Sequence, residues 1–163
     1  IDVISRPGGG SRFDVYIPAI AENVQPKPNS DCVTIQGGIE RILLVDDDKI
    51  VLFTQQKILE GLGYTVDTRI GSVDAFEAIE AHPDAYDLVI TDLTMPDLTG
   101  EQLSKKIMNL GCAIPIIICT GFSDNLSLEK LKTLGVKALV MKPVIKQDFA
   151  LAVRNVLDEV LNV

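Results

Sequence analysis

The chain has 163 residues, of which 47% are apolar and 23% charged, with a net charge of -8. This length and composition indicate a globular domain with a sizeable core rather than a disordered chain. The acidic balance argues against a nucleic-acid partner, because a phosphate backbone is bound by a clustered basic face. No apolar run approaches the roughly 20 residues of a membrane-spanning helix, and no segment resembles a signal peptide.

The three cysteines, Cys32, Cys112 and Cys119, are odd in number and form no Cys-x-x-Cys pair. Disulfide frameworks use paired cysteines in oxidising compartments, so the pattern predicts reduced thiols and a cytoplasmic location. Cys119 lies within an apolar run and is expected to pack as a small hydrophobic residue. Because the sequence starts at Ile1 rather than at methionine, it is expected to be a piece of a longer protein.

Residues 1–18 are predicted to form a β-hairpin, with a turn at residues 6–10, which read Arg-Pro-Gly-Gly-Gly. Apolar and polar residues alternate in the second strand, which is typical of a half-buried strand. A two-stranded hairpin is only marginally stable by itself in water, so this one is expected to belong to a larger sheet or to dock elsewhere. Residues 19–39 contain prolines and glycines with little periodicity, and are predicted to be a linker.

From residue 40 onward, predicted strands and helices alternate. The run Ile42-Leu43-Leu44-Val45 is apolar throughout, which suits a strand buried on both faces of a parallel sheet. The predicted strands are 40–45, 64–68, 87–91, 115–119 and 136–141, and the predicted helices are 49–61, 72–81, 100–110, 124–134 and 146–161. We therefore predict that residues 40–163 form an α/β domain, a doubly wound three-layer (βα)5 fold with a five-stranded parallel sheet.

Polar residues stand directly after four of these strands. They are Asp46 and Asp47 after the first strand, Asp92 after the third, Thr120 after the fourth and Lys142 after the fifth. The carboxyl ends of parallel strands meet at one edge, where open α/β folds place their sites. Three carboxylates so close together raise each other's pKa unless a cation neutralises them. The pattern therefore predicts a divalent metal at this edge.

In their local sequences, these residues resemble the receiver domain of response regulators. The matching motifs are Val45-Asp46-Asp47, Thr91-Asp92-Leu93-Thr94-Met95-Pro96-Asp97-Leu98-Thr99-Gly100, Cys119-Thr120-Gly121 and Met141-Lys142-Pro143. The resemblance implies a flavodoxin-like topology and a phosphoryl group that passes to Asp92 from a phosphohistidine of a partner. The Mg²⁺ ligands that it implies are Asp46, Asp47, Asp92 and the backbone carbonyl of Thr94. The phosphoryl oxygens would be bound by Thr120 and Lys142.

The segment from Gly9 to Pro18 is similar to the closing hairpin of the ATP-binding domain of sensor histidine kinases. Such a hairpin, a linker and a receiver follow one another in hybrid sensor kinases. The resemblance therefore implies the C-terminal receiver of a hybrid kinase, with residues 1–18 as a remnant of its ATPase domain. These 163 residues lack the nucleotide-binding motifs and the phospho-donor helix, so this piece is not expected to use ATP itself.

Three further residues are expected beside the pocket. Thr94 and Phe122 each lie two positions past a site residue and are expected to set the lifetime of the acyl phosphate. Phe122 would do so by shielding the phosphoryl group from water. Leu139 stands where receivers often carry Tyr or Phe, whose rotation reports phosphorylation. A leucine lacks that ring, which favours a domain that passes the phosphoryl group onward over one that switches an output module.

In the first predicted helix, Val51, Ile58 and Leu62 follow helical spacing, and Thr54 and Gln55 fill the same stripe. Leu52 and Phe53 fall outside that stripe. Two interpretations of Leu52 and Phe53 remain open. They are either covered by the linker or hairpin, or exposed beside the acidic pocket, where a four-helix, histidine-bearing partner would dock.

Other functions use similar residues. Phosphohydrolases with an aspartyl nucleophile need a second acid two positions later as general acid or base, where this chain has Thr94. An FMN binder needs a glycine- or hydroxyl-rich phosphate loop after its first strand. This chain has Asp46-Asp47-Asp48 there, which repels phosphate unless a metal intervenes. The complete set of acids, Thr120 and Lys142 argues against a receiver that is never phosphorylated.

Overall fold

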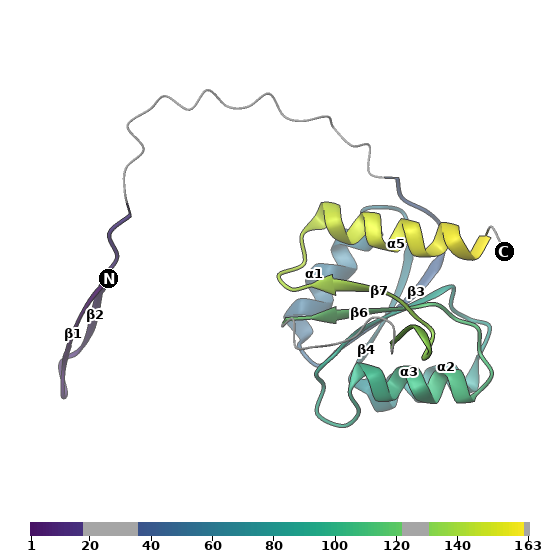
Figure 1. Cartoon of the computed structure of the whole chain (residues 1–163), viewed down its shortest axis with the longest axis horizontal. Helices are drawn as coiled ribbons and strands as arrows, with labels where there is room; N and C mark the ends of the chain where they lie inside the picture. Colours follow the sequence, from purple (N-terminus) through teal and green to yellow (C-terminus); the bar gives the residue numbers. More distant parts are fainter. Residues whose placement is uncertain (18–35, 122–130, 162–163) are drawn as a thin grey trace. The chain divides into compact units, whose positions relative to one another are not determined.

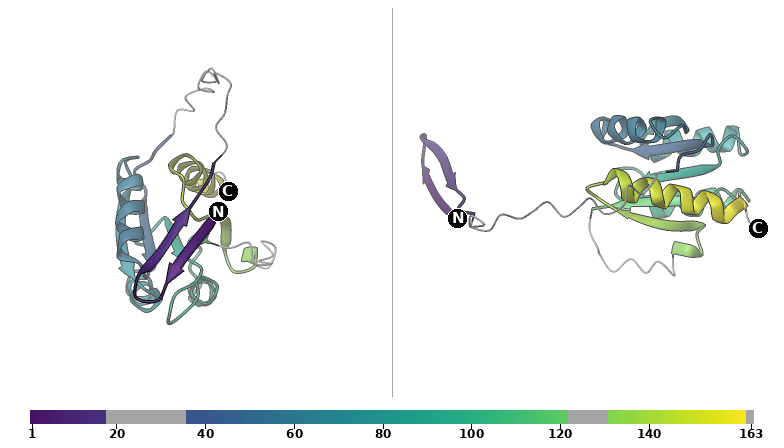
Figure 2. Two further views of the ribbon diagram at one scale, coloured as in Figure 1. Left: turned by 90° about the vertical axis from the view of Figure 1, so that its left-hand side faces the viewer. Right: turned by 90° about the horizontal axis from the view of Figure 1, so that it is seen from above.

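The computed structural model describes residues 1–17, 36–121 and 131–161, and the chain divides into two compact units, Ile1–Val33 and Thr34–Val163. The first unit contains an antiparallel hairpin of β1 (Asp2–Arg6) and β2 (Gly10–Asp14), whose strands lie side by side in Figure 2. Its register places Val3 opposite Phe13, and both side chains are exposed. The predicted hairpin is therefore confirmed.

The second unit is built on a parallel sheet (Figure 1). Its five strands lie in the order β4-β3-β5-β6-β7. The strands are β3 (Arg41–Asp46), β4 (Thr65–Ile70), β5 (Leu88–Asp92), β6 (Ile116–Thr120) and β7 (Val136–Met141). The first strand of the sheet in sequence, β3, lies between the next two, which is the flavodoxin-like order of a doubly wound sheet. The predicted α/β fold is confirmed, and every strand end lies within two residues of its predicted position.

Helices cover both faces of this sheet (Figure 1). Those on one face are α1 (Lys49–Glu60) and α5 (Lys146–Leu161), and those on the other are α2 (Ser72–Ala81) and α3 (Gly100–Asn109). Most of the helix predicted at 124–134 lies outside the described residues. Within the described part of the chain, no helix combines the length and apolar character that crossing a bilayer requires.

Alternate side chains of each strand feed the two cores. In β3, Ile42 and Leu44 pack with α1 and α5, whereas Leu43 and Val45 pack with α2 and α3. All four are almost completely buried, which is why this run is apolar without interruption. The strand is thereby held on both faces, and its carboxyl end is fixed at the edge of the sheet.

The inner face of α1 differs from the predicted one. Leu52, Gln55 and Leu59 are buried, whereas Val51 and Ile58 are only half-buried. Leu52 belongs to the core beneath α1 and α5, so its assignment as an exposed partner contact, or as a residue covered by the linker, is wrong. Gln55 lies on both the predicted and the observed stripe, so the two faces differ by a rotation of the helix about its axis. Phe53 is 62% exposed, in agreement with the second interpretation.

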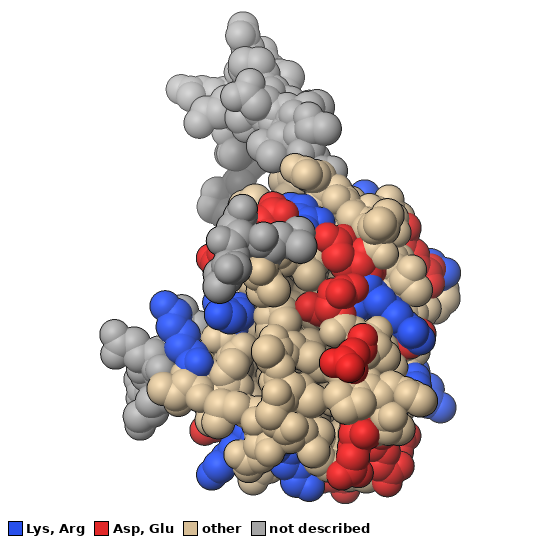
Figure 3. All heavy atoms as spheres, turned by 90° about the vertical axis from the view of Figure 1, so that its right-hand side faces the viewer, with Lys and Arg blue, Asp and Glu red and all other residues tan. Residues whose placement is uncertain are grey.

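Figure 3 shows the face of the sheet unit at the amino ends of the strands, opposite the predicted site. A cavity of about 540 Å³ opens there, with Leu110, Cys112 and Leu157 among its apolar lining residues. Asp and Glu side chains gather on one side of this face, and Asp84 and Asp87 also line the cavity. None of the predicted site residues lines it, so this cavity is separate from the chemistry described next.

Candidate functional site

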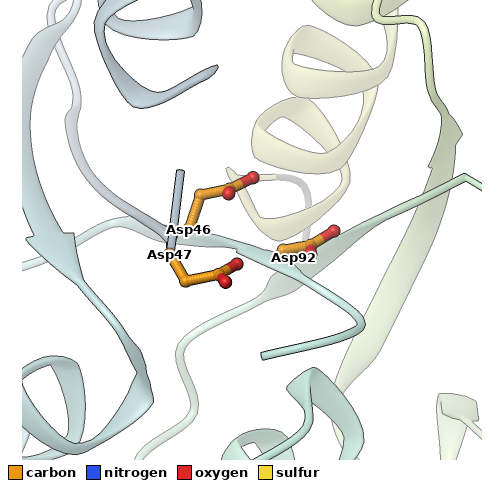
Figure 4. A group of neighbouring side chains, drawn as sticks. All are labelled: Asp46, Asp47 and Asp92. Atoms are coloured by element: carbon orange, nitrogen blue, oxygen red, sulfur yellow. The ribbon is translucent and has the colours of Figure 1, made fainter. Parts of the chain in front are cut away.

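Three carboxylates lie together at the carboxyl edge of the sheet (Figure 4). Asp46 ends β3, Asp47 follows it, and Asp92 ends the neighbouring strand β5. One oxygen of each carboxylate lies within 4.8 Å of the other two. Asp46 and Asp92 are only 2% and 8% exposed, whereas Asp47 is open to solvent. The structure thus brings together the three acids that the sequence predicted.

Lys142 supplies the positive charge of this group. Its Nζ donates to Asp46 Oδ2 at 2.9 Å and lies 2.8 Å from Asp92 Oδ1. Its backbone N–H donates to the carbonyl of Thr120 at 2.8 Å, which ties the end of β7 to the end of β6. Partial burial acts to lower the pKa of Lys142, but the hydrogen bonds to Asp46 and Asp92 outweigh it and raise that pKa. The ammonium is therefore charged at neutral pH.

A backbone hydrogen bond also orients the Asp46 carboxylate. The backbone N–H of Asp48 donates to Asp46 Oδ1 at 2.9 Å. The Asp48 carboxylate caps α1, where it accepts from the backbone N–H of Ile50 at 2.7 Å. This helix-capping role of Asp48 was not predicted, although an aspartate directly before a helix is a common N-cap.

The loop after Asp92 is held by two residues that the sequence analysis did not single out. The Ser72 hydroxyl, at the start of α2, accepts from the backbone N–H of Leu98 at 3.0 Å. Gly100 begins α3 so close to β5 that an added Cβ would lie 2.4 Å from the Asp92 carbonyl oxygen. Its N–H donates to the carbonyl of Leu93 at 2.9 Å. Only glycine allows this approach, so α3 starts directly against the acidic site.

The remaining predicted site residues lie as follows. Thr120 is buried at the end of β6, one residue past Cys119, which pairs with Asp92 across the two strands. Thr94 is exposed, and the role of its carbonyl stays a prediction. Leu139 is half-buried and packs against the core on the α2 and α3 side. Phe122 lies outside the described residues.

Cys119 lies beneath the site and behaves as a structural residue. Its thiol is free and its side chain is 1% exposed. Burial raises its pKa to about 12, with smaller opposing effects of the neighbouring charges. The thiol is therefore protonated and unreactive at neutral pH, as predicted for a small hydrophobic residue.

The donor set fits a hard divalent cation. Mg²⁺ prefers oxygen ligands at about 2.0–2.1 Å, so ligands on opposite sides of the ion lie about 4 Å apart. The oxygens of Asp46, Asp47 and Asp92 are close enough to surround one ion after small side-chain rotations. Lys142 bonds to one oxygen each of Asp46 and Asp92, and the second oxygen of Asp46 accepts from the Asp48 N–H. Each carboxylate has about four lone-pair sites, so these contacts are compatible with a metal on the same carboxylates.

Comparison with known proteins decides the family. Residues 42–154 match the response regulator receiver domain. This chain is a member of that family. The receiver domain protein of Clostridium thermocellum has a solved structure with a TM-score of 0.69 and 29% sequence identity. The similarity covers 74% of this chain and 96% of that one.

Two sensor proteins are also similar to this chain. The sensor kinase CckA of Brucella abortus (strain 2308) is 23% identical over an alignment of 163 positions, and this alignment covers 95% of this chain. The aerobic respiration control sensor protein ArcB of Escherichia coli (strain K12) is 32% identical over 109 residues, which cover 66% of this chain. The matched parts are only 17% of CckA and 14% of ArcB.

Receiver domains of two-component systems bind Mg²⁺ at an acidic pocket and work with histidine phosphotransfer partners. The predictions of a receiver domain in two-component signalling, and of its relation to the receivers of sensor kinases, are confirmed by these comparisons. The receiver fold is shown by the same matches.

Proposed function

We propose that Asp92 accepts a phosphoryl group from a phosphohistidine in a Mg²⁺-dependent reaction, and that the group then passes onward in a phosphorelay. The observation that supports this most strongly is the geometry around Asp92. Its carboxylate lies beside those of Asp46 and Asp47, and Lys142 Nζ is 2.8 Å from its Oδ1. The carboxyl edge of the sheet therefore carries the proposed nucleophile Asp92 next to the positive charge of Lys142. The proposed metal ligands lie at the same edge.

In the proposed reaction, an oxygen of Asp92 forms a bond to phosphorus while the bond from phosphorus to the imidazole nitrogen breaks. The products are an acyl phosphate and a free histidine. Charge on the transferred phosphoryl oxygens is stabilised by the Lys142 ammonium and by Thr120. Mg²⁺ would be held by Asp46, Asp47, Asp92 and the Thr94 carbonyl, and would supply further charge neutralisation.

Two alternatives are less well supported. A phosphohydrolase would need an acid at position 94, where the exposed Thr94 cannot transfer a proton at neutral pH. An FMN binder would need free amides at the start of α1 to bind a phosphate. The amides of Ile50 and Val51 already donate to the Asp48 carboxylate. Steady turnover and flavin binding are therefore both disfavoured.

The test is intact mass spectrometry of the whole chain after incubation with acetyl phosphate and Mg²⁺. One phosphoryl increment is expected, because one carboxylate has the full set of partners. Asp92→Asn should abolish the increment, whereas Asp97→Asn, an exposed aspartate on the same loop, should retain it. An increment that persists in Asp92→Asn would contradict the proposal. Continuous release of phosphate would favour the hydrolase, and a yellow protein would favour the flavin binder.

In the wider proposal, this receiver belongs to a longer parent chain, a hybrid sensor histidine kinase. The parent is a phosphotransferase, and it can be membrane-anchored with this receiver in the cytoplasm. In this setting residues 1–18 are a remnant of the ATP-binding domain, 19–39 the linker and 40–163 the receiver. Support comes from the β1–β2 hairpin and from CckA, whose similarity covers 95% of this chain. Leu139, with no aromatic ring to rotate, supports a receiver that passes the phosphoryl group onward.

A histidine-bearing helical partner would dock beside the acidic site on α1 and the segment after β7. A groove of about 340 Å³ runs there, and its lining includes Val51, Ile58 and Val144. Lys142 lines the same groove and contacts Asp92, so the groove is continuous with the site. Phe53 on α1 is exposed, which supports its predicted part in partner contact, and so is Ile50.

The double variant Ile50→Ala/Phe53→Ala tests this docking. Transfer from a phosphohistidine partner should fall about tenfold, because two apolar anchors are truncated. Labelling by acetyl phosphate should not change, since that small donor needs no docking surface. Met108→Ala is the matched control, as Met108 is exposed on α3 on the opposite face of the sheet. Unchanged transfer in the double variant would rule the docking surface out.

A further inference from the structure

Strand β4 has an open backbone edge. It is the terminal strand of the sheet and, among the described residues, pairs only with β3. The N–H groups of Thr65 and Gly71 donate to carbonyls of the β3 side, at 3.0 and 3.3 Å. Because alternate residues of a parallel strand bond to a given neighbour, the residues between them direct their N–H and C=O groups outward. These outward residues are Val66, Thr68 and Ile70.

The position of Arg69 agrees with this orientation. Its own Nη1 donates to the Thr68 carbonyl at 2.8 Å, so that carbonyl faces away from β3. An edge of this kind is a template for another strand, and proteins usually cover it or place charges along it. Asp67 and Arg69 are such charges, and they lie on the same face of β4 because they are two residues apart. Within the chain Asp67 Oδ2 already accepts from Arg41 Nη2 at 2.6 Å, so Arg69 of a second copy would share this carboxylate with Arg41.

The sequence of β4 is complementary to itself in one antiparallel register. If two copies pair about Thr68, Val66 lies opposite Ile70 and Asp67 lies opposite Arg69 of the second copy. The same register also lets the outward N–H and C=O groups of the two strands bond to each other. All three outward residues fall opposite outward residues, in pairs that exchange two N–H···O bonds. Asp67 and Arg69 then occupy the pairs between, where opposed side chains are closest.

Other registers lose these pairs. A two-residue shift keeps the backbone match but places Asp67 opposite Asp67, or Arg69 opposite Arg69, of the second copy, so like charges meet. A one-residue shift places outward residues opposite inward ones and loses the hydrogen bonds. In the favoured register Ile70, which is 50% exposed, gains Val66 of the second copy as a neighbour. The charges thus discourage arbitrary strands and permit a single self-pairing.

We propose that the β4 edge is a self-recognition surface on which a second copy of this chain adds its own β4, antiparallel and with Thr68 on the twofold axis. The contact is isologous, because each copy uses the same residues. It joins the two sheets into one and needs no phosphoryl group. Because the strands run in opposite directions, the carboxyl edges with Asp46 and Asp92 point to opposite ends and stay accessible.

Sedimentation velocity of the whole chain over a range of concentrations tests this surface. A monomer–dimer equilibrium is expected. Arg69→Glu should weaken dimerisation about tenfold or more, because it places like charges opposite Asp67 twice. In the monomer Arg69 bonds only to its neighbour's carbonyl among the contacts of the described residues, so this variant should fold normally. The matched control is Lys105→Glu on α3, where the same change affects an exposed residue away from β4.

Two further variants test the register. Asp67→Lys/Arg69→Glu restores opposite charges across the axis and should restore the dimer. Because Asp67→Lys also removes the ion-pair partner of Arg41, circular dichroism and urea denaturation first show that the variant is folded. Thr68→Pro removes the central outward N–H and should abolish the dimer, whereas an edge position of this kind tolerates proline within the monomer. In the parent chain, hydrogen exchange at Val66, Thr68 and Ile70 should slow as the protein concentration rises.

Three results would overturn the proposal. The first is a monomer at every concentration up to about 1 mM. The second is a dimer that neither Arg69→Glu nor Thr68→Pro weakens, because a different surface then holds the copies together. The third is slow exchange at Thr68 that does not depend on concentration. In that case the edge is covered within one chain.

Discussion

Lys142 places a positive charge beside the two buried carboxyl groups of Asp46 and Asp92. Its Nζ is within 2.9 Å of an oxygen of each. Like charges this close repel strongly, and a cation between them removes most of that cost. The same ammonium competes with a metal ion for the carboxylates, since both are attracted by the same negative charge.

Replacing this ammonium separates metal binding from catalysis. In Lys142→Met, Mg²⁺ should bind roughly tenfold more tightly, because a nearby positive charge is gone. Phosphorylation by acetyl phosphate should nevertheless be slower, since charge on the phosphoryl oxygens loses a donor. Titration calorimetry measures the first effect and the rate of mass increase the second. Lys146→Met, at the exposed start of α5, should change neither. Weaker Mg²⁺ binding in Lys142→Met would contradict this role.

The gathering of these residues could be predicted because it depends on backbone order alone. Asp46, Asp92 and Thr120 each end a strand, and the ends of parallel strands meet at one edge. The individual bonds could not be predicted, because they depend on side-chain rotamers and loop shape. The hydrogen bond from the Leu98 N–H to the Ser72 hydroxyl is an example. The Asp48 cap of α1, in contrast, could have been found from its position directly before the helix.

Among the helices, α1 shows most clearly where sequence patterns fail. Two stripes with helical spacing lie one position apart, Val51 with Ile58 and Leu52 with Leu59. The second is the buried one, and Gln55, which is adjacent to both stripes, is buried with it. The existence and limits of the helix were predictable from periodicity and the following glycines. The exact buried face depends on how the helix is rotated about its axis against the sheet. Periodicity alone does not distinguish two apolar stripes that lie one residue apart.

The buried Gln55 is expected to cost stability. Its side chain is 3% exposed, and its Nε2 has no hydrogen-bond partner among the described residues. Gln55→Met should raise the free energy of unfolding by about 1 kcal/mol, because an unpaired buried amide is replaced by an apolar chain of similar length. Urea denaturation measures this. Gln56→Met is the control, since Gln56 Nε2 donates to Glu60, and it should give no gain. A loss of stability in Gln55→Met would show that this amide is satisfied.

At the scale of the whole receiver unit, an ion pair fastens the start of the sheet to the last helix. Glu40, directly before β3, accepts from Arg154 Nη2 of α5 at 2.8 Å. Arg154 is 8% exposed and also bonds Asp158 at 2.9 Å. Nearby, Gly38 donates to the Leu62 carbonyl after α1. The Glu40–Arg154 ion pair joins the start of the sheet to the last helix, and the Gly38 bond joins the preceding residues to the end of α1. Both contacts should contribute to the global stability of the unit.

This ion pair makes stability depend on pH. Burial acts to raise the pKa of Glu40, but the hydrogen bond to Arg154 and its charge outweigh burial and lower that pKa below its ordinary 4.5. The stabilisation is therefore present above pH 4.5 and is lost as pH falls through the lowered value. Glu40→Gln should reduce the free energy of unfolding by about 1–2 kcal/mol at neutral pH, since Arg154 keeps Asp158.

Denaturation of both proteins at neutral pH and at a pH below the pKa of Glu40 measures the effect. The difference between Glu40→Gln and the parent chain should shrink towards zero at the acidic pH. An equal difference at both pH values would show that the Glu40 charge is not what stabilises this junction.

The most direct measurement of the central claim is the position of the phosphoryl group. The chain is labelled with acetyl phosphate and Mg²⁺, reduced with borohydride, which converts an aspartyl phosphate to homoserine, and analysed by peptide mass spectrometry. Homoserine is predicted at position 92 and at no other aspartate. Homoserine at position 46 or 47, or its absence from the whole chain, would contradict the assignment of Asp92 as the phosphoryl acceptor.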